Sequence, residues 1–398
     1  MRVSTADFYR QSIASLQRQQ SLALATQNQL SSGKKLLTGA DDPTGAAHGI
    51  SLDQTFSANQ RYTENTKAVS ERLGFEENAL SGSAESLNRI RERVLQGMGG
   101  TLGDSDRKSL AADIRQSLDT LLSYANAADG EGRYLFAGSN DASAPFSLTS
   151  SGTQFSGDDV IRQVQIGPNR AVQSSDGGAD VFLRHLSGNG TFSVEANAGN
   201  TGTATIATAK VYDASAWVSD DYTVSFAGGN YSVTDSASNV VASGAYTAGS
   251  SIRFRGADLT VTGQPADGDS FSVGPSSQKD VFQTIRDLAA LLETPTATSP
   301  ALRAQVQTAM LENLSALETA QDKIIDVRAS LGARLVAADD AGSQLSSQAV
   351  MVQEALSGLR DIDYAEAAGR LTQQLTGLQA AQQSFAKIQG LTLFDYIR

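Results

Sequence analysis

The feature that most constrains the fold is a change of sequence pattern that occurs twice, near Gly138 and near Lys279. Before and after these points, apolar side chains recur every three or four positions, which is typical of amphipathic helices. Between them apolar and polar side chains alternate, as in strands. The sequence therefore predicts a mainly α protein of the α+β class, in which an antiparallel β domain is inserted into an elongated helical rod.

Both ends of the chain carry one narrow apolar stripe. An N-terminal helix from Arg2 to about Leu30 has Ile13, Leu16, Ala23 and Leu30 on its stripe, and a C-terminal helix has Leu371, Leu375, Leu378 and Phe385. Helices with so few apolar and charged side chains are marginal alone. We therefore predict that the two stripes pair, that the remaining surface is buried against other copies or other proteins, and that the ends become helical on assembly. Contacts that run head to tail without closing would build a filament or tube.

The segments between these ends predict longer elements. A helix is expected from Thr55 to Met98, a second one capped by Asp104 or Ser105, a third from Val281 to Leu292, and a fourth from Pro300 to about Leu359. The last would span roughly 60 residues, or about 90 Å. Two hairpins are expected in the middle, around Gly228-Gly229 and around Gly256. The predicted division is an N-terminal core helix and bend (1–40), helical rod (41–138), β-rich outer insert (139–279), helical rod (280–360) and C-terminal core helix (361–398).

Composition excludes several classes of function. The 398 residues carry a net charge of -12, which opposes binding to nucleic acid. There is no cysteine and only two histidines, His48 and His185, so a zinc site is difficult to build. No segment has the roughly 20 apolar residues that a membrane span needs, and the N-terminus has no apolar run of the kind found in cleaved signal peptides. We expect neither membrane insertion nor a cleaved signal.

The stretch LSSGKKLLTGADDPTGAAHGI, from Leu30 to Ile50, has three possible roles. A phosphate loop needs glycine five residues before the Gly-Lys pair and Ser or Thr after it, and here Asn28 and Lys35 occupy those places. A metal site is not favoured, because Asp41 and Asp42 point apart on an extended chain and no further carboxylate follows at loop spacing. The favoured role is a bend in which an aspartate caps the next helix and Pro43 stiffens its start.

Other motifs give little support for catalysis. ADGDS at residues 266–270 resembles part of a calcium loop but lacks the later glutamate, so a tight turn is expected. There is no G-x-S-x-G motif, and no aromatic-rich segment accompanies the carboxylates that a glycosidase would need. We predict a protein that is not an enzyme and that uses no cofactor or metal. A glycan-binding adhesin or hydrolase module on a helical stalk is retained as a rival interpretation of the insert.

Four segments carry a resemblance to a known family. The stretch from Leu30 to Ile50 resembles the N-terminal motif of the bacterial flagellin family. MRVSTADFYR at the start, GRYLFAGSNDASAPF from Gly132 and LQAAQQSFAKIQGLTLFDYI from Leu378 are similar to the flagellin-like hook-filament junction branch of that family. The resemblance covers roughly residues 1–146 and 280–398. LysLysLeuLeuThr after SSG and the ending LFDYIR depart from filament flagellins and favour the junction branch, while a filament-forming flagellin is the alternative.

The resemblance implies a structural adaptor of the bacterial flagellum. Such a protein is exported through the flagellar type III apparatus without a cleaved signal and lies outside the cell at the hook-filament junction. Its implied partners are the first hook-associated protein, flagellin, further copies of itself in a ring or tube, and an export chaperone. Its terminal helices would form a coiled-coil tube core, with an assembly interface at Ile13, Leu16, Leu30, Leu371, Leu375, Leu378, Phe385, Ile388, Leu391 and Phe394. The bend between core and rod would comprise Ser31, Ser32, Gly33, Gly39, Asp41, Asp42 and Pro43.

Overall fold

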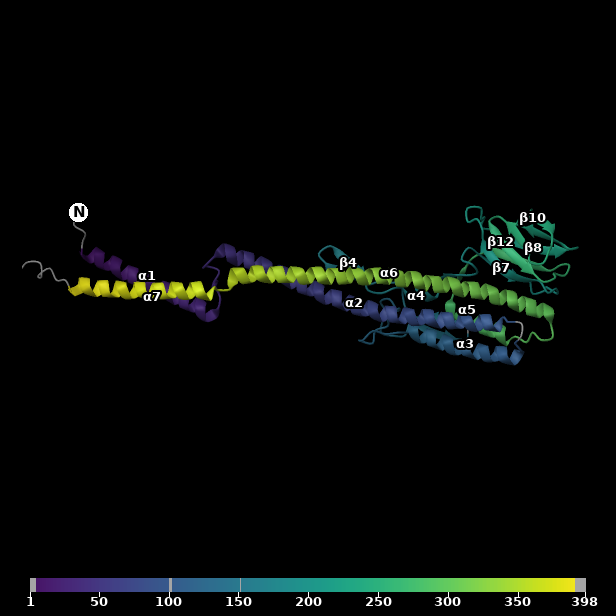
Figure 1. Cartoon of the computed structure of the whole chain (residues 1–398), viewed down its shortest axis with the longest axis horizontal. Helices are drawn as coiled ribbons and strands as arrows, with labels where there is room; N and C mark the ends of the chain where they lie inside the picture. Colours follow the sequence, from purple (N-terminus) through teal and green to yellow (C-terminus); the bar gives the residue numbers. More distant parts are fainter. Residues whose placement is uncertain (1–4, 100–101, 151, 391–398) are drawn as a thin grey trace, which may run out of the picture. The chain divides into compact units, whose positions relative to one another are not determined.

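The computed structural model describes residues 5–99, 102–150 and 152–390 (Figure 1). Its helices are α1 (Thr5–Ser32), α2 (Pro43–Gly97), α3 (Asp104–Ala125), α4 (Gly178–Phe182), α5 (Val281–Glu293), α6 (Pro300–Arg360) and α7 (Tyr364–Gly390). All the strands lie between α3 and α5 in the chain. The predicted α+β class, with helical ends and an antiparallel β domain in the middle, is confirmed. Within the described ranges, every helix is too short or too polar to cross a lipid bilayer.

The chain forms two compact units. Unit 1 contains the residues up to Glu64 and those from Gly342 onward, and unit 2 contains Asn65–Ala341. In unit 1, α1 and α7 lie side by side (Figure 1). The long helices α2 and α6 each contribute one end to unit 1 and most of their length to unit 2.

The helical part of unit 2 is built around a continuous apolar core. Helix α3 packs against α5, and the buried faces of α2 and α6 contribute Leu73, Leu80, Leu317 and Ile324 to the same core. A group of aromatic rings extends it toward the short strands that follow α3. Their ring centroids are 5.0–5.9 Å apart, and the group comprises Phe136, Phe146, Phe155, Phe182 and Phe282.

The β domain of unit 2 contains two larger antiparallel sheets, with strand orders β10-β9-β8-β13-β6 and β11-β12-β7. Three two-stranded ladders, β1-β2, β3-β4 and β5-β14, lie outside them. The strands are β1 (Phe146–Thr149), β2 (Gly152–Phe155), β3 (Gln163–Gly167), β4 (Arg170–Gln173), β5 (His185–Leu186), β6 (Phe192–Ala196), β7 (Thr205–Val211), β8 (Tyr222–Ala227), β9 (Asn230–Thr234), β10 (Val240–Ala245), β11 (Ser251–Phe254), β12 (Ala257–Thr262), β13 (Ser270–Pro275) and β14 (Gln278–Lys279).

Both predicted hairpins are present. Strands β8 and β9 are joined by Gly228 and Gly229, which have φ values of 56° and 75°. Strands β11 and β12 turn at Arg255 and Gly256. Glycine is required at 256, because an added Cβ would lie 2.2 Å from the carbonyl oxygen of Asp213. The alternating sequence pattern therefore identified these turns correctly.

The predicted helix limits differ from the structure at two places. Helix α2 begins at Pro43, where the bend prediction placed an aspartate cap, and not at Thr55, where its apolar pattern starts, because Asp42 caps it and the polar residues that follow continue the helix. Helix α3 takes Gly103 as its N-cap in place of Asp104 or Ser105. The Gly103 N–H donates to the Asp106 carboxylate at 3.3 Å, so an acidic residue in the first turn supplies the cap interaction.

Candidate functional site

The α1–α7 seam is a heptad-like packing of two helices within unit 1. The less exposed side chains of α1 recur at alternating spacings of three and four, at Tyr9, Ser12, Leu16, Gln19, Ala23, Thr26 and Leu30. Those of α7 recur in the same way, at Ala367, Leu371, Gln374, Leu378, Ala381 and Phe385. The rings of Tyr9 and Phe385 meet edge-on at 5.1 Å, which fixes the register of the two helices at one end of the seam. This spacing is the pattern of coiled coils.

The seam is unusually polar for a coiled coil. Among the side chains described on these two helices, only Ala23 and Thr26 on α1 and Ala367 on α7 are buried, and the larger apolar side chains of the seam are half-buried. The side-chain carbonyl oxygens of Gln19 and Gln374 are buried, and neither accepts a hydrogen bond from any described residue. A buried acceptor without a partner typically costs about 1–3 kcal/mol. The pairing of α1 with α7 is therefore weak by itself.

The structure places the predicted interface residues in two groups. Leu16, Leu30, Leu371, Leu378 and Phe385 are half-buried in the α1–α7 seam, whereas Ile13 and Leu375 are 41% and 50% exposed. The side chain of Ile388, and Leu391 and Phe394, lie outside the described residues.

Two exposed leucines were missed by the sequence reasoning. Leu22 and Leu24 of α1 are 51% and 52% exposed, and neither follows the apolar stripe that was read from the sequence. Leu24 lies eleven residues after Ile13, which on a helix places both side chains on nearly the same face. This spacing of eleven residues was the sequence signal that could have identified Leu24. Unit 1 thus leaves apolar side chains on both sides of the seam uncovered.

A groove of about 270 Å³ runs along the α1–α7 seam. Its walls combine hydroxyl and amide groups with the side chains of Leu16 and Phe385, and the other lining residues are Gln11, Ser12, Ser15, Ala381 and Ser384. A groove with this mixture suits another helix of similar composition better than a small substrate, because the lining residues that the structure describes include no titratable group.

The bend after α1 is paired with the break between α6 and α7. Gly33 has φ 70°, a conformation that favours glycine, and its carbonyl oxygen accepts from the Ile362 N–H at 3.0 Å. The Lys35 N–H donates to the Arg360 carbonyl oxygen at 2.6 Å. Backbone hydrogen bonds therefore hold the two chain reversals together, although more than 300 residues separate them in the sequence.

The two aspartates of the bend perform different tasks. Asp41 accepts from the Leu37 and Thr38 N–H groups at 3.1 and 2.8 Å, and the Thr38 hydrogen bond holds the pKa of Asp41 below its usual value. Asp42 accepts from the Thr44 and Gly45 N–H groups at 3.1 and 2.9 Å, which is the geometry of an N-cap.

The other bend residues make local contacts. Ser31 and Ser32 donate their hydroxyl hydrogens to carbonyl oxygens in the last turn of α1, at 3.0 and 3.2 Å. Pro43 takes the first position of α2, where its missing N–H has no cost. Gly39, in contrast to Gly33, is exposed and does not have a positive φ.

One contact of this site was missed by sequence reasoning. Arg360, at the end of α6, forms a two-pronged ion pair with Asp53 of α2, in which Nη1 lies 3.0 Å from Oδ1 and Nη2 contacts Oδ2. The hydrogen bond with Asp53 raises the pKa of Arg360. The guanidinium also lies within 3.5 Å of the position that a Cβ would take at Gly49, so a larger residue there would crowd it. No spacing rule links positions 53 and 360.

Outside the seam and the bend, the described residues offer few groups suited to metal binding or catalysis. No group of three His, Asp or Glu side chains within those residues is placed to hold a metal ion. Asp269 of the ADGDS segment accepts from three backbone N–H groups, those of Thr201, Gly202 and Ala266, and thus closes a turn. His185 is buried beside Thr284, and burial lowers its pKa to about 4, so it is neutral at physiological pH.

Comparisons with known proteins match the two helical ends and the insert separately. The bacterial flagellin N-terminal helical region matches residues 3–141, and the bacterial flagellin C-terminal helical region matches residues 314–397. Residues 195–275 match the D2-like domain of flagellar hook-associated protein 1. Both helices of the α1–α7 seam thus fall within flagellin-type regions.

Relatives of similar length are also found. Flagellar hook-associated protein 3 of Escherichia coli is 27% identical over 99% of both chains. The crystal structure of Xanthomonas campestris FlgL is 37% identical, with a TM-score of 0.72, and the match covers 77% of this chain and 99% of that chain. The flagellar junction protein FlgL of Legionella pneumophila is 32% identical, also with a TM-score of 0.72, over 79% of this chain and all of that chain.

Proposed function

We infer that this chain, which belongs to the flagellin-like family of flagellar hook-associated protein 3 (FlgL), is a structural adaptor between the hook and the filament of a bacterial flagellum. Its work is to join two different protein surfaces, so the function requires binding faces and no catalytic centre. The partners we propose are the first hook-associated protein on the hook side, flagellin on the filament side, and further copies of this chain.

The observation that carries this proposal is the incomplete burial of unit 1. The α1–α7 seam contains two buried amide oxygens that accept no hydrogen bond from the described part of the chain, and its flanks expose Ile13, Leu22, Leu24 and Leu375. A protein that worked as a monomer would gain nothing from these features, because each lowers the free energy of unfolding. In an assembly, neighbouring helices would cover the leucines and could donate to the glutamine oxygens.

The paired bends have a defined role in this proposal. Asp42, Gly33 and the Arg360–Asp53 ion pair fix where α1 ends and α2 begins, so they fix the direction in which the α1–α7 seam leaves the bend. We propose that this direction sets the surface that the seam presents to neighbouring subunits. Export through the type III apparatus as an unfolded chain, with the help of a chaperone, belongs to the same proposal and accounts for a fold that contains no disulfide.

Deletion of the gene in its own bacterium tests the function. Loss of a junction protein leaves complete hooks in place and full-length flagellin shed into the medium, because filament subunits have no surface on which to polymerise. Loss of a sole filament flagellin would leave no flagellin to shed. Bare hooks together with shed flagellin, restored to filaments by a plasmid copy of this chain, are the expected result; normal filaments after deletion would contradict the proposal.

The involvement of the terminal helices is tested separately by limited proteolysis. We expect residues 1–30 and 365–398 of the purified monomer to be cleaved well before unit 2, and to become protected in assembled flagella. Equal resistance of both units in the free monomer would show that the ends do not depend on assembly for their stability.

A further inference from the structure

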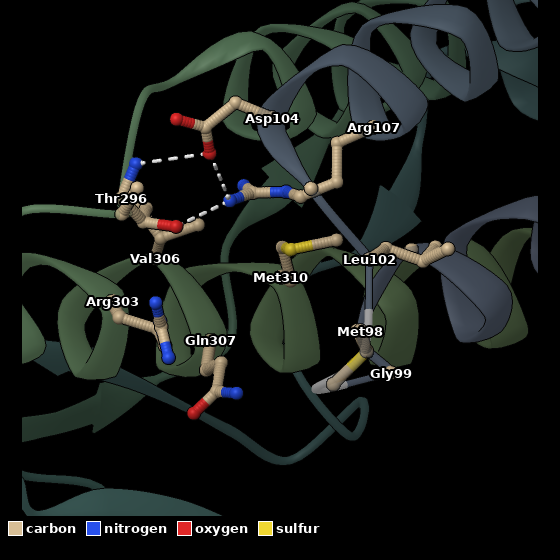
Figure 2. Close-up of a pocket in the computed structure, with 13 residues that line it drawn as sticks. Met98, Gly99, Leu102, Asp104, Arg107, Thr296, Arg303, Val306, Gln307 and Met310 are labelled. Carbon is tan, nitrogen blue, oxygen red and sulfur yellow. Dashed lines mark hydrogen bonds and ion pairs between the residues drawn. The ribbon is translucent and has the colours of Figure 1, made fainter.

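A small cavity lies in unit 2 beside the start of α3 and the start of α6 (Figure 2). Its volume is about 80 Å³, and the residues that define its chemistry are Arg107, Thr296, Arg303 and Gln307, with Met98 and Met310 as apolar walls. A bound water needs a cavity volume of roughly 10–15 Å³, so this cavity can hold a few waters or one compact ion.

Arg107 is a buried cation whose charge is incompletely neutralised. It is 7% exposed, and it donates from Nη1 to the Thr296 hydroxyl at 2.5 Å and from Nη2 to the Leu291 carbonyl oxygen at 2.9 Å. Its Nε is buried and has no acceptor within the described part of the chain. The carboxylate paired with it, that of Asp104, is 3.8 Å away and accepts a hydrogen bond from the Thr296 N–H.

Arg303 places a second guanidinium against the same cavity. It lies in the first turn of α6, it is exposed, and its guanidinium forms no hydrogen bond or ion pair with any residue that the structure describes. Burial lowers the pKa of Arg107, and the positive charge of Arg303 acts in the same direction. The two cations therefore repel each other, although the residues of unit 2 include 33 acidic and only 21 basic side chains.

We propose that this cavity binds a small oxyanion, a phosphate or carboxylate group, between the guanidinium groups of Arg107 and Arg303. Guanidinium groups match the geometry of such anions and form charge-assisted hydrogen bonds with them. The exposed Arg303 gives the anion a path from solvent, and the two methionines limit the size of what fits. A bound anion neutralises the excess charge and supplies the acceptor that the buried Nε lacks.

Anion binding would connect three segments that line this cavity. Arg107 belongs to α3, Thr296 to the connection between α5 and α6, and Arg303 to α6. The anion can be free in solution, or it can be the side-chain carboxylate of a neighbouring protein chain. Both sources present the same chemistry, and both predict that Arg303 acts as the residue that admits and holds the anion.

Thermal unfolding of the full chain tests the site, with inorganic phosphate as the probe and sodium chloride at equal ionic strength as the reference. We expect phosphate, at a concentration about tenfold above its Kd, to raise the Tm of unit 2 by about 2–5 °C. The shift should disappear in Arg303→Gln and persist in Arg89→Gln. Arg89 is an exposed helical arginine of the same unit, and its guanidinium forms no hydrogen bond or ion pair with another described residue.

Acetate and an assembly assay distinguish the two sources. A Tm increase with phosphate or acetate that requires Arg303 identifies a site for free anions. If neither salt acts, a loss of this chain from sheared flagella in Arg303→Gln but not in Arg89→Gln identifies a neighbouring carboxylate as the occupant. If Arg303→Gln changes neither the salt response nor the amount of assembled protein, the inference is overturned. Unchanged circular dichroism of the variant shows that it is folded.

Discussion

Units 1 and 2 share the same helical spacing of apolar side chains, but they bury very different amounts of apolar surface. Two apolar cores stabilise unit 2, one among the helices and one in the β domain, and within the described ranges none of the buried residues that form them belongs to unit 1. Unit 1 buries mostly alanine, threonine and single aliphatic side chains, and it exposes Ile13, Leu22, Leu24 and Leu375. An apolar stripe therefore does not say whether a helix is stabilised by its own chain or by another. The source of the stabilisation depends on how much apolar surface of the same chain packs against the stripe.

Charge separates the units as well. The residues of unit 1 include ten basic and ten acidic side chains, whereas those of unit 2 include 21 and 33, so unit 2 carries the whole net charge of -12. A neutral surface allows identical copies to approach closely, while an acidic one makes them repel. The neutral unit also exposes Leu22, Leu24 and Leu375, which are each about half accessible. Both properties favour unit 1 as the part through which copies meet.

The largest expected difference between the units is the effect of removing a core side chain. Phe282 is fully buried, with ring centroids of Phe146 and Phe182 at 5.4 and 5.9 Å, so Phe282→Ala should lower the free energy of unfolding of unit 2 by about 3–5 kcal/mol. Leu371→Ala, at a half-buried site of the α1–α7 seam, should cost about 1 kcal/mol or less in the monomer. Urea unfolding followed by circular dichroism measures both. Equal losses would remove the distinction between the units.

A second difference is the pH dependence of unit 2. Burial, and then the charge of Lys279, lower the pKa of His185 to about 4, against 6.5 in the unfolded chain. The neutral imidazole is thus favoured by folding. Its contribution to the free energy of unfolding is complete above pH 6.5. As the pH falls to 4 this contribution is lost, and the loss is then about 3 kcal/mol. The measurement is the difference in unfolding free energy between the natural chain and His185→Gln at pH 7 and pH 4.

The comparison with His185→Gln is needed because a second buried group titrates in the opposite sense. Burial and the neighbouring Asp176 raise the pKa of Glu76 to about 8, so this carboxyl destabilises unit 2 as the pH rises from 4.5 toward 8. Glu76→Gln should remove that loss and leave the His185 effect intact. A natural chain and His185→Gln variant with parallel stability curves between pH 4 and 7 would contradict the assignment to His185.

The sequence predicted the parts of this fold that depend on local patterns. Apolar side chains at helical spacing identified the terminal helices, and Gly228-Gly229 identified a hairpin, because each signal lies within a few residues. The long helix from Pro300 was expected to end near Leu359 and ends at Arg360. Contacts between distant positions left no such signal, as the pairing of Arg360 with Asp53 and of Gly33 with Ile362 shows.

The polar members of the α1–α7 seam also could not be predicted. Gln19 and Gln374 look like surface residues in the sequence, and only the placement of one helix against the other shows that their oxygens are buried. A search for apolar stripes selects Ile13 and Leu375 instead, which are half exposed. Whether these two residues form the assembly interface is still a prediction.

Glycine at the bend should matter at one position and not at the other. Gly33→Ala forces a residue with a Cβ into φ 70°, which costs about 1 kcal/mol in unit 1 and changes the direction of the α1–α7 seam. Gly39→Ala is the matched control, because Gly39 has no positive φ and is exposed. We expect Gly33→Ala to reduce swimming in soft agar far more than it lowers the monomer's Tm. A variant that is less stable yet fully motile would show that the bend serves folding alone.

The smallest effect on stability should accompany a clear effect on assembly. Leu375→Ala removes a side chain that is 50% exposed, so the monomer should change by less than about 0.5 kcal/mol. Leu95→Ala is its counterpart in unit 2, on α2, where the leucine is 45% exposed. If unit 1 carries the interface, only Leu375→Ala should reduce the amount of this chain in sheared flagella and increase shed flagellin. Equal effects of the two substitutions would mean that exposure of a leucine, and not its place in the α1–α7 seam, determines the outcome.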